Sequence, residues 1–134
     1  MLTTLAMTCL MEVAYYEARN QPEPAQFAVV EVALRRVKDW RWKDDPCSVV
    51  YAPAQYEWAI DKPEKKPEEH HSWLLAGEIV GILVRSGKYS ATRCADHHHD
   101  ISVTPDWTKR MDFEIQIGDI RFYCSDPEDW RRPK

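Results

Sequence analysis

Near its N-terminus the chain reads Cys9-Leu10-Met11-Glu12-Val13-Ala14-Tyr15-Tyr16-Glu17-Ala18-Arg19. Apolar residues recur here at the three- and four-residue spacing of an amphipathic helix, which we expect to cover residues 1–18. Its inward face is predicted to carry Leu2, Leu5, Ala6, Cys9, Leu10 and Val13. Glu17 comes four residues after Val13 and therefore extends that face.

A carboxylate on the buried stripe of a helix is costly unless it is paired or neutralised. Burial raises the pKa of a carboxyl group, and a raised pKa suits a general acid. Glu17 is therefore a candidate catalytic acid. The alternative is structural, because ion pairs also bury carboxylates, and Arg19, Arg35 or Arg36 could then be its partner.

The remaining periodicities predict an α+β fold, with N-terminal helices and a small antiparallel β-hairpin or sheet in the C-terminal third. Further helices are expected over residues 24–38 and 68–86, the latter apolar on so many sides that we expect it to be central and heavily buried. Residues 113–117 and 120–124 alternate apolar and polar side chains, and Gly118-Asp119 between them predicts a two-residue hairpin turn.

Composition limits the function. The 134 residues are 44% hydrophobic and 30% charged, which predicts one catalytic domain over residues 1–134 with a loosely ordered tail at 125–134. The net charge of -4 argues against nucleic acid as a partner. The sequence has no long apolar run, so we expect no insertion into a membrane. It has no basic N-terminal region, so we expect synthesis in a cytoplasm without a signal peptide. We also expect the protein to be a monomer.

The four cysteines, Cys9, Cys47, Cys94 and Cys124, match no zinc motif by spacing. We expect them to be buried free thiols, since cysteine packs as a small hydrophobe. The alternative is one or two disulfides, if the protein works outside the cell.

The run His97-His98-His99 has Asp96 before it and Asp100 after it. In a strand, His97 and His99 would face the same side and could hold zinc with a third ligand from His70, His71 or an aspartate. The sequence contains no His-Glu-x-x-His motif. We therefore expect no metal and no cofactor, and keep zinc as an alternative.

Fragments spread over residues 9–124 carry a family resemblance. They are Cys9-Leu10, Tyr16-Glu17-Ala18-Arg19, residues 26–37, residues 47–51, Gln55-Tyr56-Glu57-Trp58, Ala95-Asp96-His97-His98-His99, residues 103–107 and residues 117–123. In order and spacing they resemble the SleB-type cell-wall hydrolase family, the spore-cortex-lytic enzymes with their phage and bacterial relatives.

The resemblance implies a lysozyme-like fold that cleaves the bond between N-acetylmuramic acid (MurNAc) and N-acetylglucosamine (GlcNAc) in peptidoglycan. In the family the glutamate of the Glu-Ala-Arg motif is the catalytic acid, which here is Glu17. Gln55 and Tyr123 match positions near the family's cleft, and His97 or His99 matches a residue that contacts the substrate or the catalytic glutamate. Tyr56 and Trp58 are further candidates, because aromatic side chains with a polar edge suit sugars.

Three reactions remain possible. The family's usual product, a 1,6-anhydro sugar, implies a lytic transglycosylase that needs one carboxylate. A muramidase that hydrolyses the same bond would use a second carboxylate, for which Glu57 is the candidate. A zinc-dependent amidase or peptidase would use the histidine run. The expected partner is the peptidoglycan glycan strand of a bacterial cell wall, and the chain resembles a compact phage endolysin.

Overall fold

The computed structural model describes residues 2–52, 55–60 and 67–126. For Glu57 and Ile60 the structure describes the backbone but not the side chains. The elements, in chain order, are helices α1 (Thr4–Ala18), α2 (Glu23–Lys38), α3 (Pro46–Val50), α4 (Glu57–Ile60) and α5 (His70–Ser86), strand β1 (His97–Asp100), the 3-10 helix η1 (Asp106–Arg110), and strands β2 (Asp112–Ile117) and β3 (Ile120–Cys124). The α+β class is confirmed.

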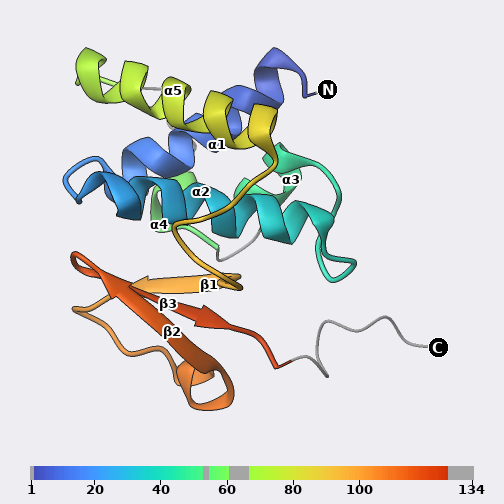
Figure 1. Ribbon diagram of the computed structural model, residues 1–134, viewed down its shortest axis with the longest axis vertical. Helices are drawn as coiled ribbons and strands as arrows, with labels where there is room; N and C mark the ends of the chain where they lie inside the picture. Colours follow the sequence, from blue (N-terminus) through green and yellow to red (C-terminus); the bar gives the residue numbers. More distant parts are fainter. Residues whose placement is uncertain (1, 53–54, 61–66, 127–134) are drawn as a thin grey trace.

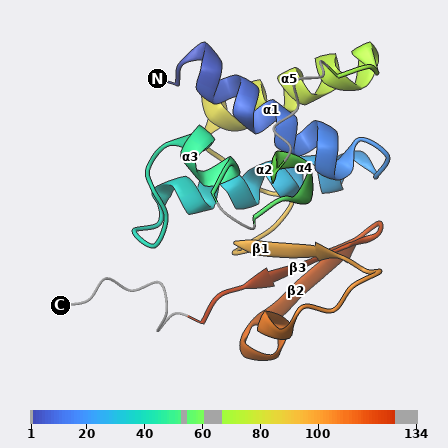
Figure 2. The same ribbon diagram turned by 180° about the vertical axis from the view of Figure 1, so that it is seen from behind.

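Helix α2 is the central helix of the molecule. It lies between α1 and α5 on one side and the sheet on the other, as both views show (Figure 1, Figure 2). Val29, Val30 and Val32 on different sides of α2 are therefore each fully buried. The expectation that residues 68–86 form a central, heavily buried helix was wrong, because α5 covers one side only and leaves Leu74 and Ile82 exposed.

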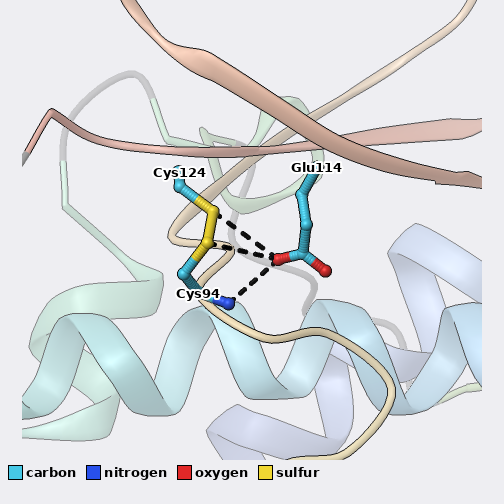
Figure 3. Close-up of side chains that lie close together, drawn as sticks. All are labelled: Cys94, Glu114 and Cys124. Carbon is cyan, nitrogen blue, oxygen red and sulfur yellow. Dashed lines mark hydrogen bonds between the residues drawn. A yellow bond between two sulfur atoms is a disulfide. The ribbon is translucent and has the colours of Figure 1, made fainter.

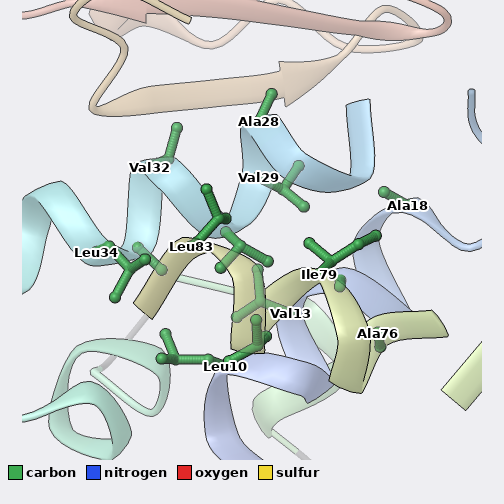
Figure 4. Packing of buried hydrophobic residues seen from close by; sticks show 14 of the residues in the cluster. Leu10, Val13, Ala18, Ala28, Val29, Val32, Leu34, Ala76, Ile79 and Leu83 are labelled. Carbon is green, nitrogen blue, oxygen red and sulfur yellow. The ribbon is translucent and has the colours of Figure 1, made fainter. Parts of the chain in front are cut away.

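The helical core forms where α1, α2 and α5 meet. Leu10 and Val13 of α1, Val29 of α2 and Ile79 of α5 point toward one another there (Figure 4). Complete burial of each such side chain contributes about 1.5–3 kcal/mol. Leu5 was wrongly assigned to this face: it lies in the first turn of α1 and is 69% exposed.

The sheet has the order β1-β3-β2, with both pairings antiparallel. Ile117 pairs with Ile120, which confirms the two-residue turn at Gly118-Asp119. A bulge between Phe113 and Ile115 interrupts the register of β2. The regular alternation expected for this strand is therefore broken, and both Phe113 and Ile115 are exposed.

The tip of this hairpin binds the loop between α1 and α2. Gln21 donates from Nε2 to Asp119 Oδ2 at 3.3 Å and accepts from the Asp119 backbone N–H at 2.9 Å. Gly118 has a φ of 56°, which favours glycine, and a Cβ there would collide with Gln21 and Pro22. The contact places one end of the sheet beside the C-terminal end of α1.

Charged residues of α2 hold the segment that leads into β1. Glu31, only 1% exposed, accepts from the backbone N–H groups of Ala91 and Thr92 at 3.0 and 2.9 Å. Arg35 donates to the Ala95 carbonyl at 2.9 Å, and Arg36 donates from Nε to the Asp96 carbonyl at 2.8 Å. These hydrogen bonds attach residues 91–96, and with them the sheet, to the central helix.

All four cysteines form disulfides, so the expectation of free thiols was wrong. Cys9 of α1 is bonded to Cys47 of α3, and Cys94 is bonded to Cys124 at the end of β3. Figure 3 shows the Glu114 carboxylate beside the second bond, where it accepts from the Cys94 backbone N–H at 2.9 Å. Spacing in the sequence carried no information on these pairs, because the fold brings together cysteines 38 and 30 residues apart.

Two further expectations concern the ends and surfaces of the chain. The predicted loose tail began at residue 125, but Ser125 is buried and its N–H donates to Asp96 Oδ1 at 3.0 Å; residues 127–134 lie outside the described part. No helix in the described ranges is long and apolar enough to cross a membrane.

His98 packs between the two layers of the molecule. Its ring lies 6.1 Å from the ring centre of Tyr56 and 5.7 Å from that of Phe122. Desolvation, assisted by the positive charge of Arg36, lowers the pKa of His98 to about 3. Its imidazole is therefore neutral at physiological pH.

Removing the Cys94–Cys124 disulfide should destabilise the protein. The double substitution Cys94→Ala/Cys124→Ala should lower the free energy of unfolding by about 2–4 kcal/mol, because the unfolded chain loses a loop-closing cross-link. Denaturant titration measures the difference. Treatment of the wild type with a reductant should lower its stability further than this, since it also opens Cys9–Cys47; equal stability of variant and wild type would contradict the prediction.

His98 should make the protein less stable in acid. Its folded pKa lies below the unfolded value of about 6.5, so the unfolded chain takes up a proton first as the pH falls, and stability is lost between pH 6.5 and pH 3. Between pH 7 and pH 4, the free energy of unfolding of His98→Phe should fall by about 2–3 kcal/mol less than that of the wild type. Thermal melts across this range measure the effect, with the exposed His71→Phe as control. The same pH dependence in His98→Phe and wild type would refute it.

Candidate active site

Glu17 lies in the last turn of α1 and is half-buried. Its Oε1 accepts a hydrogen bond from the indole N–H of Trp58 at 2.9 Å. Val13, one helical turn earlier, and Ala18, the next residue, are buried in the core, so the end of the helix is firmly placed. The apolar stripe of α1 thus brings Glu17 to the border between core and solvent.

The arginines considered as structural partners of Glu17 bond to other groups. Arg19 pairs with Glu69 at 3.3 Å, and Arg35 lies 4.0 Å from Glu31. Arg36 hydrogen-bonds to Gln55 and to the Asp96 carbonyl. Arg36 still interacts electrostatically with Glu17, so the charge of a buried cation acts on the candidate acid.

Aromatic rings surround the indole that holds Glu17. Trp58 stacks on Tyr16 and on Tyr56, with ring centres 5.0 and 5.2 Å apart. Tyr51 meets Trp58 edge-on at 6.2 Å, and its hydroxyl donates to Glu12 at 2.9 Å. We call these four side chains, Tyr16, Tyr51, Tyr56 and Trp58, the aromatic wall. The sequence indicated Tyr56 and Trp58, and the structure places both beside Glu17.

Tyr56 contributes a buried hydroxyl group to the same place. The residue is 4% exposed, and its hydroxyl has no hydrogen-bond partner among the described residues. Burial raises the pKa of Tyr56 to about 12, opposed by Arg36 and supported by the negative charge of Glu17. The phenol therefore stays protonated and retains a proton to donate.

Gln55 is linked to the site through Arg36. The guanidinium of Arg36 donates to Gln55 Oε1 and lies 5.1 Å from the ring centre of Trp42. Burial lowers the pKa of Arg36, but a guanidinium remains charged in a protein. The structure thus gives Gln55 an ordered carbonyl oxygen at the side of the site. Glu57, the proposed second carboxylate, has a side chain outside the description, so its role stays a prediction.

The three histidines point to opposite faces of the sheet. His98 packs toward Tyr56, as described above, whereas His97 and His99 contact Trp107 on the other face at 5.2 and 5.7 Å. Tyr123 stacks on His99 at 5.3 Å and also meets Trp107. We call His97, His99, Trp107 and Tyr123 the outer-face cluster. The expected common side for His97 and His99 is confirmed, but these residues form a cluster distinct from the aromatic wall.

Trp42 lies between the outer-face cluster and Arg36. Its ring lies 5.8 Å from His97 and is covered by the guanidinium of Arg36. From the sequence, Arg36 was expected only as an ion-pair partner, and neither Trp42 nor Tyr16 was assigned a role. Tyr16 precedes Glu17 directly, and this adjacency is the signal that could have identified it.

Among the described residues, no group of three possible metal ligands includes a histidine of the run. Within residues 2–52, 55–60 and 67–126, the only group of three potential ligands is Cys94, Glu114 and Cys124 (Figure 3). Both cysteines of this group are oxidised, and metal binding by cysteine requires a thiolate. His97 instead bonds to Asp96 at 2.9 Å, and His99 to Tyr123 at 3.0 Å.

Comparison with solved structures supports the lysozyme-like expectation for the fold. The catalytic domain of the germination-specific lytic transglycosylase SleB from Bacillus anthracis matches with a TM-score of 0.75 and 21% identity, over 91% of this chain and 96% of that chain. The catalytic domain of the Bacillus cereus SleB protein matches with a TM-score of 0.71 and 22% identity, over 91% and 92% of the two chains. A search of curated proteins found no significant match.

The sequence model described as Cell Wall Hydrolase matches residues 20–123. This range holds α2, the outer-face cluster and three residues of the aromatic wall, and it begins just after Glu17. Since the match covers well over half of the 134 residues, this protein belongs to the cell wall hydrolase family.

Proposed function

We propose that this protein cleaves peptidoglycan glycan strands between MurNAc and GlcNAc as a lytic transglycosylase, with Glu17 acting first as acid and then as base. One observation carries the proposal: a half-buried carboxyl at a helix end is held by an indole N–H inside a wall of aromatic rings. The name of the Bacillus anthracis neighbour, a lytic transglycosylase, supports the same reaction.

The reaction needs a proton on the oxygen that leaves. Glu17 donates this proton to the glycosidic oxygen while the sugar passes through an oxocarbenium-like state. The carboxylate that remains then removes the proton of the muramic acid 6-hydroxyl. That oxygen attacks the anomeric carbon of its own ring and closes the 1,6-anhydro bond. Glu17 ends as it began, protonated, and no water is consumed.

Opposing electrostatic influences suit a group that must exist in both states. The C-terminal end of α1 carries partial negative charge, which favours the neutral carboxyl. The Trp58 N–H and the charge of Arg36 favour the carboxylate. A general acid works best when neither state is strongly preferred.

The aromatic wall and Tyr56 supply the substrate contacts. Flat rings bury the apolar faces of sugars. The Tyr56 hydroxyl is enclosed by protein, so we assign Tyr56 to substrate binding through Trp58, the ring on which it stacks.

The disulfides agree with a place of action in the cell wall. Disulfides persist in oxidising surroundings and are rare in a reducing cytoplasm. The two cross-links, Cys9–Cys47 and Cys94–Cys124, therefore favour action outside the cytoplasm.

True hydrolysis remains a second candidate reaction. The sugar end that is formed distinguishes hydrolysis from the transglycosylase reaction.

The substitution Glu17→Gln should abolish wall cleavage without unfolding the protein. An amide cannot donate or accept the reacting proton, and loss of general acid–base catalysis costs roughly 10²–10⁴-fold in rate. Purified peptidoglycan is digested with wild type and variant, and mass spectrometry identifies the ends. We expect 1,6-anhydromuramic acid ends from the wild type and none from the variant.

Other products would each change the conclusion. Reducing muramic acid ends would show hydrolysis and turn attention to Glu57. Cut peptides on intact glycan would refute glycosidase activity altogether. Full activity of a folded Glu17→Gln variant would remove Glu17 from the mechanism.

Trp58→Phe separates the indole N–H from the aromatic wall. Phenylalanine keeps a stacking ring but cannot donate to Glu17, so we expect kcat to fall about tenfold or more with KM changed less than threefold. Turbidity loss of wall suspensions measures both parameters, and Trp73→Phe, which alters a half-buried tryptophan packed on Tyr15, is the control. A raised KM with unchanged kcat would show that Trp58 only contacts sugar.

A further inference from the structure

The outer face of the sheet carries a pocket that the proposed reaction does not use. It has a volume of about 400 Å³ and is lined by His99, Ile101, Thr104, Gln116, Arg121 and Tyr123. These residues come from β1, β2, β3 and the loop after β1. None of the described residues that line the pocket carries a carboxylate, although the chain as a whole has a net charge of -4.

A chain of hydrogen bonds orders the floor of this pocket. His99 Nδ1 lies 2.7 Å from the Asp100 carbonyl, which can only accept, so Nδ1 carries the proton and Nε2 is an acceptor. The Tyr123 hydroxyl donates to His99 Nε2 at 3.0 Å and accepts from Arg121 Nε at 3.2 Å. His99 and Tyr123 are 8% and 6% exposed, so this arrangement is built into the sheet.

The Arg121 guanidinium is fixed from two more directions. Its Nη1 donates to Gln116 Oε1 at 3.1 Å, and its carbon lies 4.1 Å from the ring centre of Phe113. A guanidinium has five N–H donors, and these hydrogen bonds use two of them. The remaining donors are held in a fixed plane at the pocket.

Arg121 has no acidic partner within the described part of the chain. The nearest acids along the strands are engaged elsewhere: Asp100 accepts from the Ser102 N–H at 2.8 Å, and Asp119 from Gln21 at 3.3 Å. Glu114 accepts from the Cys94 N–H. An ordered cation with only neutral partners, set in a pocket, is suited to bind an anion.

The rim of the pocket indicates the kind of anion. Ile101 lines it and is 47% exposed, and Val103 nearby in the same loop is 54% exposed. A guanidinium beside aliphatic side chains fits a carboxylate that carries a small alkyl group. The C-terminal alanine of a peptide combines these two features.

We propose that this pocket binds the terminal carboxylate of the peptide stems that branch from peptidoglycan, with Arg121 as the anion-binding residue. The identity of the ligand rests on the proposed function, because it takes peptidoglycan as the substrate. The pocket shares His99 and Tyr123 with the outer-face cluster, and Trp42 lies between that cluster and Arg36. A stem bound here would add affinity for walls with intact peptides and would leave the chemical step unchanged.

The first test uses binding alone, so it does not depend on catalysis. The full-length protein is titrated with acetyl-D-alanyl-D-alanine and with its C-terminal amide, followed by the backbone amide signals of the sheet. We expect the acid to bind at least about tenfold more tightly than the amide. Arg121→Gln should abolish that preference, Arg121→Lys should keep part of it, and Lys88→Gln, an exposed lysine beyond α5 with the same change of charge, should keep all of it.

The second test compares substrates. Intact peptidoglycan should show a KM raised severalfold in Arg121→Gln with kcat unchanged, whereas glycan strands stripped of their peptides should be cleaved equally by variant and wild type. If the wild type cleaves neither substrate, the proposed function fails while the binding result still decides the nature of the pocket.

Three results would overturn the proposal. Equal binding of acid and amide would show that no carboxylate is recognised. Unchanged binding in a folded Arg121→Gln variant would remove Arg121. The muramic acids of the stripped glycan carry a free lactyl carboxylate. If Arg121 is needed to bind this glycan but not to bind the dipeptide, the pocket belongs to the glycan and not to the stem.

Discussion

The attachment of residues 91–96 to three charged side chains of α2 determines how the two layers fit together. Glu31, Arg35 and Arg36 bind the backbone of this segment. A hydrogen bond between a charged side chain and the backbone contributes about 1.5–3 kcal/mol. The interaction is therefore specific as well as strong: residues 91–96 can take one path across α2, and that path fixes where β1 begins.

The candidate active site depends on the same attachment. Arg36 joins the Asp96 carbonyl, Gln55 and Trp42, and its charge also acts on Glu17 and Tyr56. One side chain therefore contributes to the junction of the layers and to the electrostatics of the site. A change at Arg36 would alter stability and activity together, so its effect on activity alone would say little about the reaction.

Patterns of short range made much of the fold predictable. The stripe Cys9, Leu10 and Val13 identified α1 and the special position of Glu17, and the alternation around Gly118-Asp119 identified the hairpin. The prediction of a central helix over residues 68–86 failed, because apolar residues on many sides of α5 indicated burial, while the position of α2 between two layers makes α2 the central helix. The bulge in β2 was equally invisible, since it depends on which residue of β3 each residue of β2 faces.

The parts of the site that were missed depend on contacts between distant residues. Arg35 and Arg36 were considered only as ion-pair partners of Glu17, and Glu31 was given no role, because their backbone partners come about 60 residues later. The same holds for the pairing of the cysteines and for the contact of Trp58 with Glu17. His97 and His99 were correctly expected to face the same side of a strand. The register with β3 and the contacts of the two rings show that they belong to another cluster than Glu17.

The placement of the disulfides has a mechanical consequence. Cys9–Cys47 joins two helices, and Cys94–Cys124 joins the start and the end of the sheet region, so neither bond crosses the junction between the layers. Each layer is therefore stiffened covalently, while hydrogen bonds and packing hold the two layers against each other. Reduction of both disulfides would remove the cross-links within the layers and would leave the contacts at their junction in place.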